Sequence, residues 1–321
     1  EISACLVGSE MCIRDRISHL VAKVFKKSTQ ETWVGFLFRE PNLGKMKGKR
    51  VKVSVMKILF IGDIVGRVGR QAVKHYLPAL KKKHKVNLTI ANGENAAGGK
   101  GITRPIFKEL MQVGIDVVTM GNHTWDKREV YQFIDQEDKI IRPANYPNSD
   151  QVPGKGITYV QVNDQELAII NLHGRALMGD LEDPFRVGLD LVDQANKRTP
   201  HIFVDFHAET TSEKEAMGWF LDGKASALVG THTHVQTNDN RILPNGTAYV
   251  SDVGMTGFAD GILGMERQAI LNKFLTQLPA RIKAPEVGEA RLNASLVNID
   301  KFGRAGSIEM IRIDKENPFY I

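Results

Sequence analysis

The chain has 321 residues, of which 42% are hydrophobic and 25% are charged, which is typical of a globular protein. No apolar run approaches the roughly 18 residues of a membrane-spanning helix. The short apolar pieces of the N-terminal segment are interrupted by charged residues, which is not expected of a secretory signal. Residues 1–55 contain 11 Lys or Arg and 5 Asp or Glu, so they carry the whole net charge of +6. The rest of the chain is neutral overall, which argues against a strong nucleic-acid-binding patch on it.

Both cysteines of the chain, Cys5 and Cys12, lie in this basic N-terminal segment. The chain from Met56 onward therefore contains neither disulfides nor thiolate metal sites. This composition is compatible with the reducing cytoplasm, which is the location that we expect.

The N-terminal segment shows no sustained hydrophobic period, and its residues 5–15 resemble translated sequencing-adapter read-through. We interpret residues 1–55 as a non-native or disordered extension; the alternative is a genuine basic arm that binds a partner. We interpret residues 56–321 as one domain. A chain that begins at Met56 is expected to fold and act as the full chain does.

Apolar and amphipathic stretches alternate over the first part of this domain. The pattern predicts buried strands at 58–61, 87–91 and 115–120, and helices at 70–83, 106–113 and 127–134. Such an alternation of strands and helices, with continuously apolar strands, indicates an α/β fold with a largely parallel sheet covered on both faces.

The second part begins with an expected hairpin, at 157–162 and 166–172, around Asn163 and Asp164. Further strands are expected at 202–206, 225–229, 248–250, 291–299 and 307–313. Helices are expected at 184–197, 212–220 and 266–275, with Pro184 in the first turn of one and Ser212 as the cap of another. We find no internal repeat and no linker.

Five short polar clusters each follow one of the expected strands. They contain Asp63, then Glu94 with Asn95, then Asn122 with His123, then His207, and finally His232 with His234. Ligands of α/β sheets gather at the carboxyl ends of strands, so these side chains are expected to converge. Their Asp, Glu, Asn and His donors suit divalent metals, which indicates a two-metal site for the hydrolysis of phosphate esters.

Each cluster taken alone has a simpler interpretation. The glycines at 62, 66 and 69 lack the spacing of a dinucleotide-binding loop, and the glycines at 98–101 lack the Walker pattern. Asp63 could cap a helix, and His207 could be a hydrogen-bonded core histidine. His232 and His234 would share a face on a strand, but in a loop they could turn to different metals. The coincidence of all five clusters favours the metal site.

The motifs resemble those of the calcineurin-like metallophosphoesterases. The Gly-Asn-His at 121–123 and the Gly-Thr-His-Thr-His at 230–234 carry this resemblance. Two departures from the superfamily pattern, Val65 in place of a histidine and Glu94 in place of an aspartate, are similar to the bacterial YmdB-type 2′,3′-cyclic-nucleotide 2′-phosphodiesterases. The similarity extends over 56–320.

The resemblance implies a four-layer αββα sandwich of two mixed sheets, with two divalent ions, Fe or Mn. One ion would be held by Asp63, Glu94, Asn95 and His234, and the other by Glu94, Asn122, His207 and His232. Glu94 would bridge the ions, and Asn95 would replace the missing histidine. His123 would be the catalytic proton donor.

The implied reaction is the hydrolysis of a small cyclic nucleotide to a nucleoside 3′-phosphate. The ions would activate water and neutralise phosphoryl charge, while His123 protonates the departing ribose oxygen. One alternative is a phosphomonoesterase, or a phosphodiesterase for other cyclic nucleotides, on the same site. Another is a regulatory protein that binds a partner or RNA and uses metals structurally. The segments 172–183 and 235–240 are expected to face the base, and the sequence leaves open whether the protein forms a homo-oligomer.

Overall fold

The computed structural model describes residues 56–147 and 149–320. The interpretation of residues 1–55 as an extension concerns a segment outside these described residues and stays an expectation. Within the described residues, no helix combines the length and the apolar character needed to cross a membrane.

The first of two sheets is mixed and has eight strands. These are β1 (Met56–Ile61), β2 (Asp63–Ile64), β3 (Leu88–Asn92), β4 (Val117–Thr119), β5 (Ile140–Ile141), β12 (Met255–Phe258), β13 (Ala290–Ile299) and β14 (Ala305–Ile313). Their order is β2-β12-β13-β1-β3-β4-β5, with β14 paired to β13. Strands β1, β3, β4 and β5 run parallel, whereas β13 runs antiparallel to β1 and β14.

The second sheet has six strands. These are β6 (Ile157–Val162), β7 (Gln165–His173), β8 (Ile202–His207), β9 (Ala227–Thr231), β10 (Arg241–Ile242) and β11 (Ala248–Val250), in the order β10-β11-β9-β8-β7-β6. Strands β7, β8, β9 and β11 are parallel. Strands β6 and β7 form the predicted hairpin, whose turn places Asn163 in the left-handed region at φ 56°.

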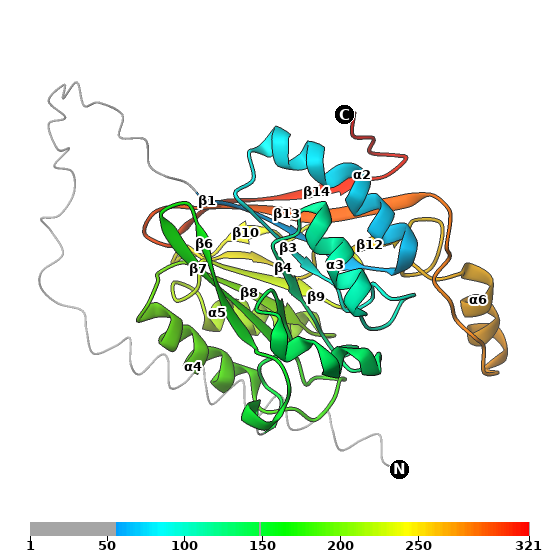
Figure 1. Cartoon of the computed structure of the whole chain (residues 1–321), viewed down its shortest axis with the longest axis horizontal. Coiled ribbons are helices and arrows are strands. Elements are labelled where there is room, and N and C mark those ends of the chain that lie inside the picture. Colours follow the sequence, from blue (N-terminus) through cyan, green and yellow to red (C-terminus); the bar gives the residue numbers. More distant parts are fainter. Residues whose placement is uncertain (1–55, 148, 321) are drawn as a thin grey trace, which may run out of the picture. The chain divides into compact units, whose positions relative to one another are not determined.

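The two sheets pack face to face between two layers of helices (Figure 1). Phe60 of β1 stacks on Phe203 of β8 with 5.6 Å between the ring centroids. Helices α2 (Gly66–His84) and α3 (Arg104–Val113) cover the outer face of the first sheet, and α4 (Pro184–Asn196) and α5 (Thr211–Phe220) cover that of the second. Central strands such as β1 are therefore buried on both faces, which explains their continuously apolar sequence. The αββα prediction is confirmed.

The remaining differences from the sequence-based prediction have local causes. The first sheet is mixed because β13 and β14 return to it, and one of its faces is covered by the second sheet. Helix α2 begins at Gly66, four residues early, despite two glycines in its first turn. One of them, Gly69, lies so close to β12 that an added Cβ would be 2.2 Å from the Thr256 carbonyl oxygen. The expected helix at 127–134 is two 3₁₀ segments, η1 (Arg128–Gln132) and η2 (Ile134–Gln136).

The N-cap of α5 is Thr210, so the prediction of Ser212 was wrong. The Thr210 hydroxyl accepts a hydrogen bond from the Glu213 amide at 3.4 Å. We expect Thr210→Ala to lower the free energy of unfolding by about 0.5–1 kcal/mol, because the cap satisfies an otherwise free amide. Urea denaturation measures the change, and Ser212→Ala is the control. A larger loss in the Ser212 variant than in the Thr210 variant would contradict the assignment.

Candidate active site

The five polar clusters lie together at the carboxyl ends of the parallel strands. Asp63 follows β1, Glu94 and Asn95 follow β3, and Asn122 follows β4. From the second sheet, His207 ends β8, and the loop after β9 carries His232 and His234. Face-to-face packing of the sheets therefore brings residues from distant parts of the chain, such as Asp63 and His234, into contact distance.

One group of donors surrounds the imidazole of His207. Its Nε2 lies 2.9 Å from Asn122 Oδ1 and 3.2 Å from Glu94 Oε1. The Nδ1 atom of His232 lies 3.0 Å from the same nitrogen. Candidate donor atoms of Glu94, His207 and His232 all lie within 4.8 Å of one another. Two imidazoles, a carboxylate and an amide oxygen thus converge, which is a suitable donor set for a borderline divalent metal.

A second group lies on the other side of Glu94. Asn95 Nδ2 lies 3.0 Å from Glu94 Oε1 and 3.2 Å from His234 Nε2. That His234 nitrogen is 3.8 Å from Asp63 Oδ1. A metal would take the Asn95 oxygen, which a half-turn of the amide brings to the position of the nitrogen. Glu94 Oε1 contacts both groups, which is the position that a bridging carboxylate needs.

The charges of these residues fit a bound cation. Asp63 is completely buried, and its Oδ1 accepts no hydrogen bond. Burial raises the pKa of Asp63, and the attraction of His234 and His207 opposes that rise. Burial also disfavours charge on His207, but Glu94 and Asp63 outweigh it and raise the pKa of His207 to about 9. Without metal, a proton on His207 therefore offsets part of the buried negative charge, and a divalent cation would take its place.

Gly121 is required for the close approach of the donors. A Cβ added there would lie 2.4 Å from Glu94 Oε2 and 2.5 Å from His207 Nε2. The glycine of the Gly-Asn-His motif therefore lets β4 end directly against the donor atoms.

Each of the three histidines is oriented by a partner on its other nitrogen. His207 Nδ1 lies 2.9 Å from the Thr231 hydroxyl, His232 Nε2 lies 2.9 Å from Glu209, and His234 Nδ1 lies 3.1 Å from the Leu263 carbonyl. The partner of each ring takes an N–H, so the opposite nitrogen is the one that would bind a metal. These second partners were not predicted from the sequence, although Glu209 stands in the same cluster as His207.

The Thr231 hydroxyl connects His207 to a buried acid. It donates to Asp205 Oδ1 at 2.8 Å, so it can accept the N–H of His207 Nδ1. Asp205 also accepts from the Thr119 hydroxyl, and burial raises the pKa of Asp205 to about 7. The chain Asp205–Thr231–His207 therefore fixes which nitrogen of His207 faces the donors.

We expect Thr231→Val to weaken metal binding at the His207 group by about 10–100-fold, the usual effect of losing a ligand's hydrogen-bond partner. Valine has the same shape but cannot accept the Nδ1 proton. Competition with a chelator measures the affinity, and Thr231→Ser, which keeps the hydroxyl, is the control. Unchanged affinity in the valine variant would show that the tautomer is set otherwise.

The loop that carries His232 and His234 is strained and firmly anchored. The two histidines have φ values of 100° and 65°, in the left-handed region that non-glycine residues avoid. Between them, the Thr233 amide and hydroxyl donate to Asp252 Oδ2, which also accepts from buried Lys214 at 2.7 Å. The two histidines therefore lie in a loop, as one of the two interpretations of their spacing predicted. The ring of His232 turns to the His207 group, and the ring of His234 turns to Asn95 and Asp63.

His123 lies beside the donors without joining either group. Its backbone amide donates to Glu94 Oε2 at 2.9 Å, and its Nδ1 lies 3.0 Å from Asp126 Oδ2. Asp126 therefore holds one side of the ring, and Nε2 is left for a ligand in the adjacent cavity. The sequence analysis missed Asp126, although its position three residues after His123 was a signal.

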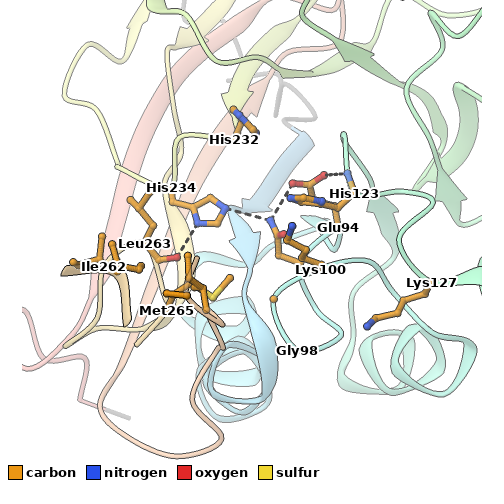
Figure 2. Close-up of a pocket in the computed structure, with 15 residues that line it drawn as sticks. Glu94, Gly98, Lys100, His123, Lys127, His232, His234, Ile262, Leu263 and Met265 are labelled. Atoms are coloured by element: carbon orange, nitrogen blue, oxygen red, sulfur yellow. Dashed lines mark hydrogen bonds between the residues drawn. The ribbon is translucent and has the colours of Figure 1, made fainter. Parts of the chain in front are cut away.

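A cavity of about 590 Å³ opens over the donors. Glu94, His123, Lys100 and Lys127 lie on one side of it, and Ile262, Leu263 and Met265 lie across from them (Figure 2). None of the described residues in 172–183 or 235–240 is among those that line this cavity. The segments expected to face the base therefore do not line this cavity, whereas several residues between 262 and 282 do.

A sandwich of this kind with Asp, Glu, Asn and His at its strand ends is typical of metallophosphoesterases. The family model described as YmdB-like protein matches residues 59–311, and the chain belongs to this family. It is 56% identical over 266 residues to the 2′,3′-cyclic-nucleotide 2′-phosphodiesterase of Bacillus subtilis (strain 168), covering 83% of this chain and 100% of that protein.

Solved structures agree with this assignment. A hypothetical protein from Thermus thermophilus is 41% identical with a TM-score of 0.76, and the match covers 81% of this chain and 99% of that one. A novel phosphatase from Mycoplasma pneumoniae is 32% identical with a TM-score of 0.77, over 82% of this chain and 94% of that one.

Proposed function

We propose that this protein is a two-metal phosphodiesterase that hydrolyses 2′,3′-cyclic nucleotides to nucleoside 3′-phosphates. The observation that carries the proposal is the pair of donor groups on either side of Glu94, at the base of a cavity that also contains His123. The activity named for the Bacillus subtilis relative supports the substrate class.

We assign Asp63, Glu94, Asn95 and His234 to one ion, and Glu94, Asn122, His207 and His232 to the other. When bound, the ions supply Lewis-acid activation of water and neutralise charge on the phosphoryl oxygens. The mixed nitrogen and oxygen donors suit Fe or Mn. Lys100 and Lys127 line the same cavity and add positive charge for an anionic phosphate.

His123 acts as the proton donor in this proposal. Its Nε2–H protonates O2′ as the bond from phosphorus to O2′ breaks. The oxygen of water forms the new bond to phosphorus and keeps one hydrogen, while the other proton of the water goes to solvent, from which His123 is reprotonated. Asp126 Oδ2 lies 3.0 Å from Nδ1 and so orients the ring with Nε2 toward the cavity. The leaving group departs as a neutral hydroxyl, and the phosphate stays on O3′.

The test is metal analysis of the purified protein together with product analysis. We expect about two metal ions per chain and conversion of 2′,3′-cyclic AMP to 3′-AMP, with activity lost on chelation and restored by Fe²⁺ or Mn²⁺. Release of inorganic phosphate from 3′-AMP without opening of the cyclic ester would favour the phosphomonoesterase alternative. Metal-loaded protein without hydrolysis of either compound would favour a binding role. Two iron or manganese ions and a cytoplasmic location stay predictions.

A further inference from the structure

One side of the cavity over the donors is lined by apolar side chains, whereas the donor residues and lysines of the cavity are polar or charged. Ile262, Leu263, Met265, Ile270, Ala280 and Ile282 form this side, which we call the apolar wall. Its members Ile262, Leu263 and Met265 lie across from Glu94, His123 and Lys100 (Figure 2). A phosphate bound at the donors would leave the rest of its molecule against an aliphatic surface.

The backbone of the turn at 262–265, which forms part of the apolar wall, offers few free hydrogen-bonding groups. The amides and carbonyls of Ile262 and Met265 bond to each other in both directions at 3.0 Å. The Leu263 carbonyl accepts from His234 Nδ1 at 3.1 Å. These groups are therefore unavailable to read the edge of a ligand, whereas the side chains offer a flat apolar contact.

The turn that presents the wall has a strained backbone. Leu263 has a φ of 52°, unusual for a residue with a bulky side chain, and the residue is 45% exposed. Ile282 is 38% exposed. Strain that exposes apolar side chains at a binding cavity indicates a surface made for a ligand.

His234 ties this wall to the metal donors. One nitrogen of its ring faces Asp63 and Asn95, and the other holds the Leu263 carbonyl. The distance between the donor groups and the wall is thus set by a single imidazole ring, so one small molecule can reach both.

We propose that the apolar wall binds the nucleobase of the cyclic nucleotide through its face, without reading its edges. This inference rests on the proposed function and deepens it by naming the part of the site that recognises the base. A purine or pyrimidine ring covers Leu263 and Ile282, and the Met265 thioether makes a favourable sulfur–aromatic contact with it. The phosphate and ribose are recognised at the donors, and any of the four bases is accepted.

The experiment compares kcat/KM for 2′,3′-cyclic AMP with that for methyl riboside 2′,3′-cyclic phosphate, which has the same reacting ester but no base. We expect the protein to prefer the nucleotide by at least about 10-fold, because binding energy from a remote group raises the rate. Met265→Ala and Ile282→Ser should each lose about 10-fold on the nucleotide and keep the activity on the methyl riboside. All four 2′,3′-cyclic nucleotides should react within about 10-fold of one another.

The matched control is Phe274→Ser. Phe274 is a 73% exposed apolar residue of α6 (Arg267–Thr276), the helix that also supplies Ile270, but it does not line the cavity. The Phe274→Ser variant should hydrolyse both the cyclic nucleotide and the methyl riboside ester at the rates of the unchanged protein. Equal losses on both substrates in the wall variants, or no loss on either, would overturn the proposal. If the unchanged protein hydrolyses both esters equally, the base site is wrong but the proposed function stands; if it hydrolyses neither, both are wrong.

Discussion

His123→Ala is expected to keep both metals and to lose about 10²–10⁴-fold in turnover of 2′,3′-cyclic nucleotides. The side chain makes its hydrogen bond to Asp126 and not to the donor groups, so its removal leaves those groups intact. The lost step is protonation of the ribose oxygen, which otherwise departs as a poor alkoxide leaving group. Metal analysis and turnover are measured on the same preparation.

The role of His123 is separated from positioning by the leaving group. A nitrophenyl phosphodiester releases an acidic phenol that departs without a proton, so the loss should be much smaller for this substrate. Asp126→Asn, which removes the carboxylate that orients the His123 ring, should show the same dependence on leaving group with a smaller loss. Equal losses on both substrates would mean that His123 positions phosphate instead.

Glu94→Gln is expected to lose more metal than any other single change among the donors. Glu94 Oε1 lies 3.0 Å from Asn95 Nδ2 and 3.2 Å from His207 Nε2, so one oxygen serves both donor groups. A neutral amide of the same shape removes the negative charge that would attract both cations. We expect element analysis to find well below one metal ion per chain and no measurable turnover.

Asp63→Asn is the matched control for this change. The Asp63 carboxylate of the unchanged protein approaches His234, and Asp63 is buried as Glu94 is. The Asp63 variant should lose one ion and keep the other. Thermal unfolding gives a second measurement. The wild-type protein should lose stability on chelation, by about 2.7 kcal/mol for each metal site if the metal had been present at 100 times its Kd, and the Glu94 variant should hardly respond. About two metals per chain with normal turnover in Glu94→Gln would refute the bridging role.

The amino-acid sequence by itself determined the class of fold and the residues that gather at the site. A continuously apolar strand such as 58–61 is expected to be buried on both faces, and polar residues placed just after such strands lie at the carboxyl edge. For this reason Asp63, Glu94, Asn122 and His207 could be grouped from their positions along the chain alone.

Only the tertiary structure decided which atoms meet. The pairing of His207 with Thr231 and Asp205, of His123 with Asp126, and of His234 with the Leu263 carbonyl depends on ring rotations and loop φ values that no periodicity encodes. The apolar wall was missed for the same reason: the short apolar stretch at 262–265 and the separate residues Ala280 and Ile282 show no pattern of a binding site until the fold places them over the donors. Local patterns fix burial and direction, whereas contacts between distant segments depend on the packing of the two sheets.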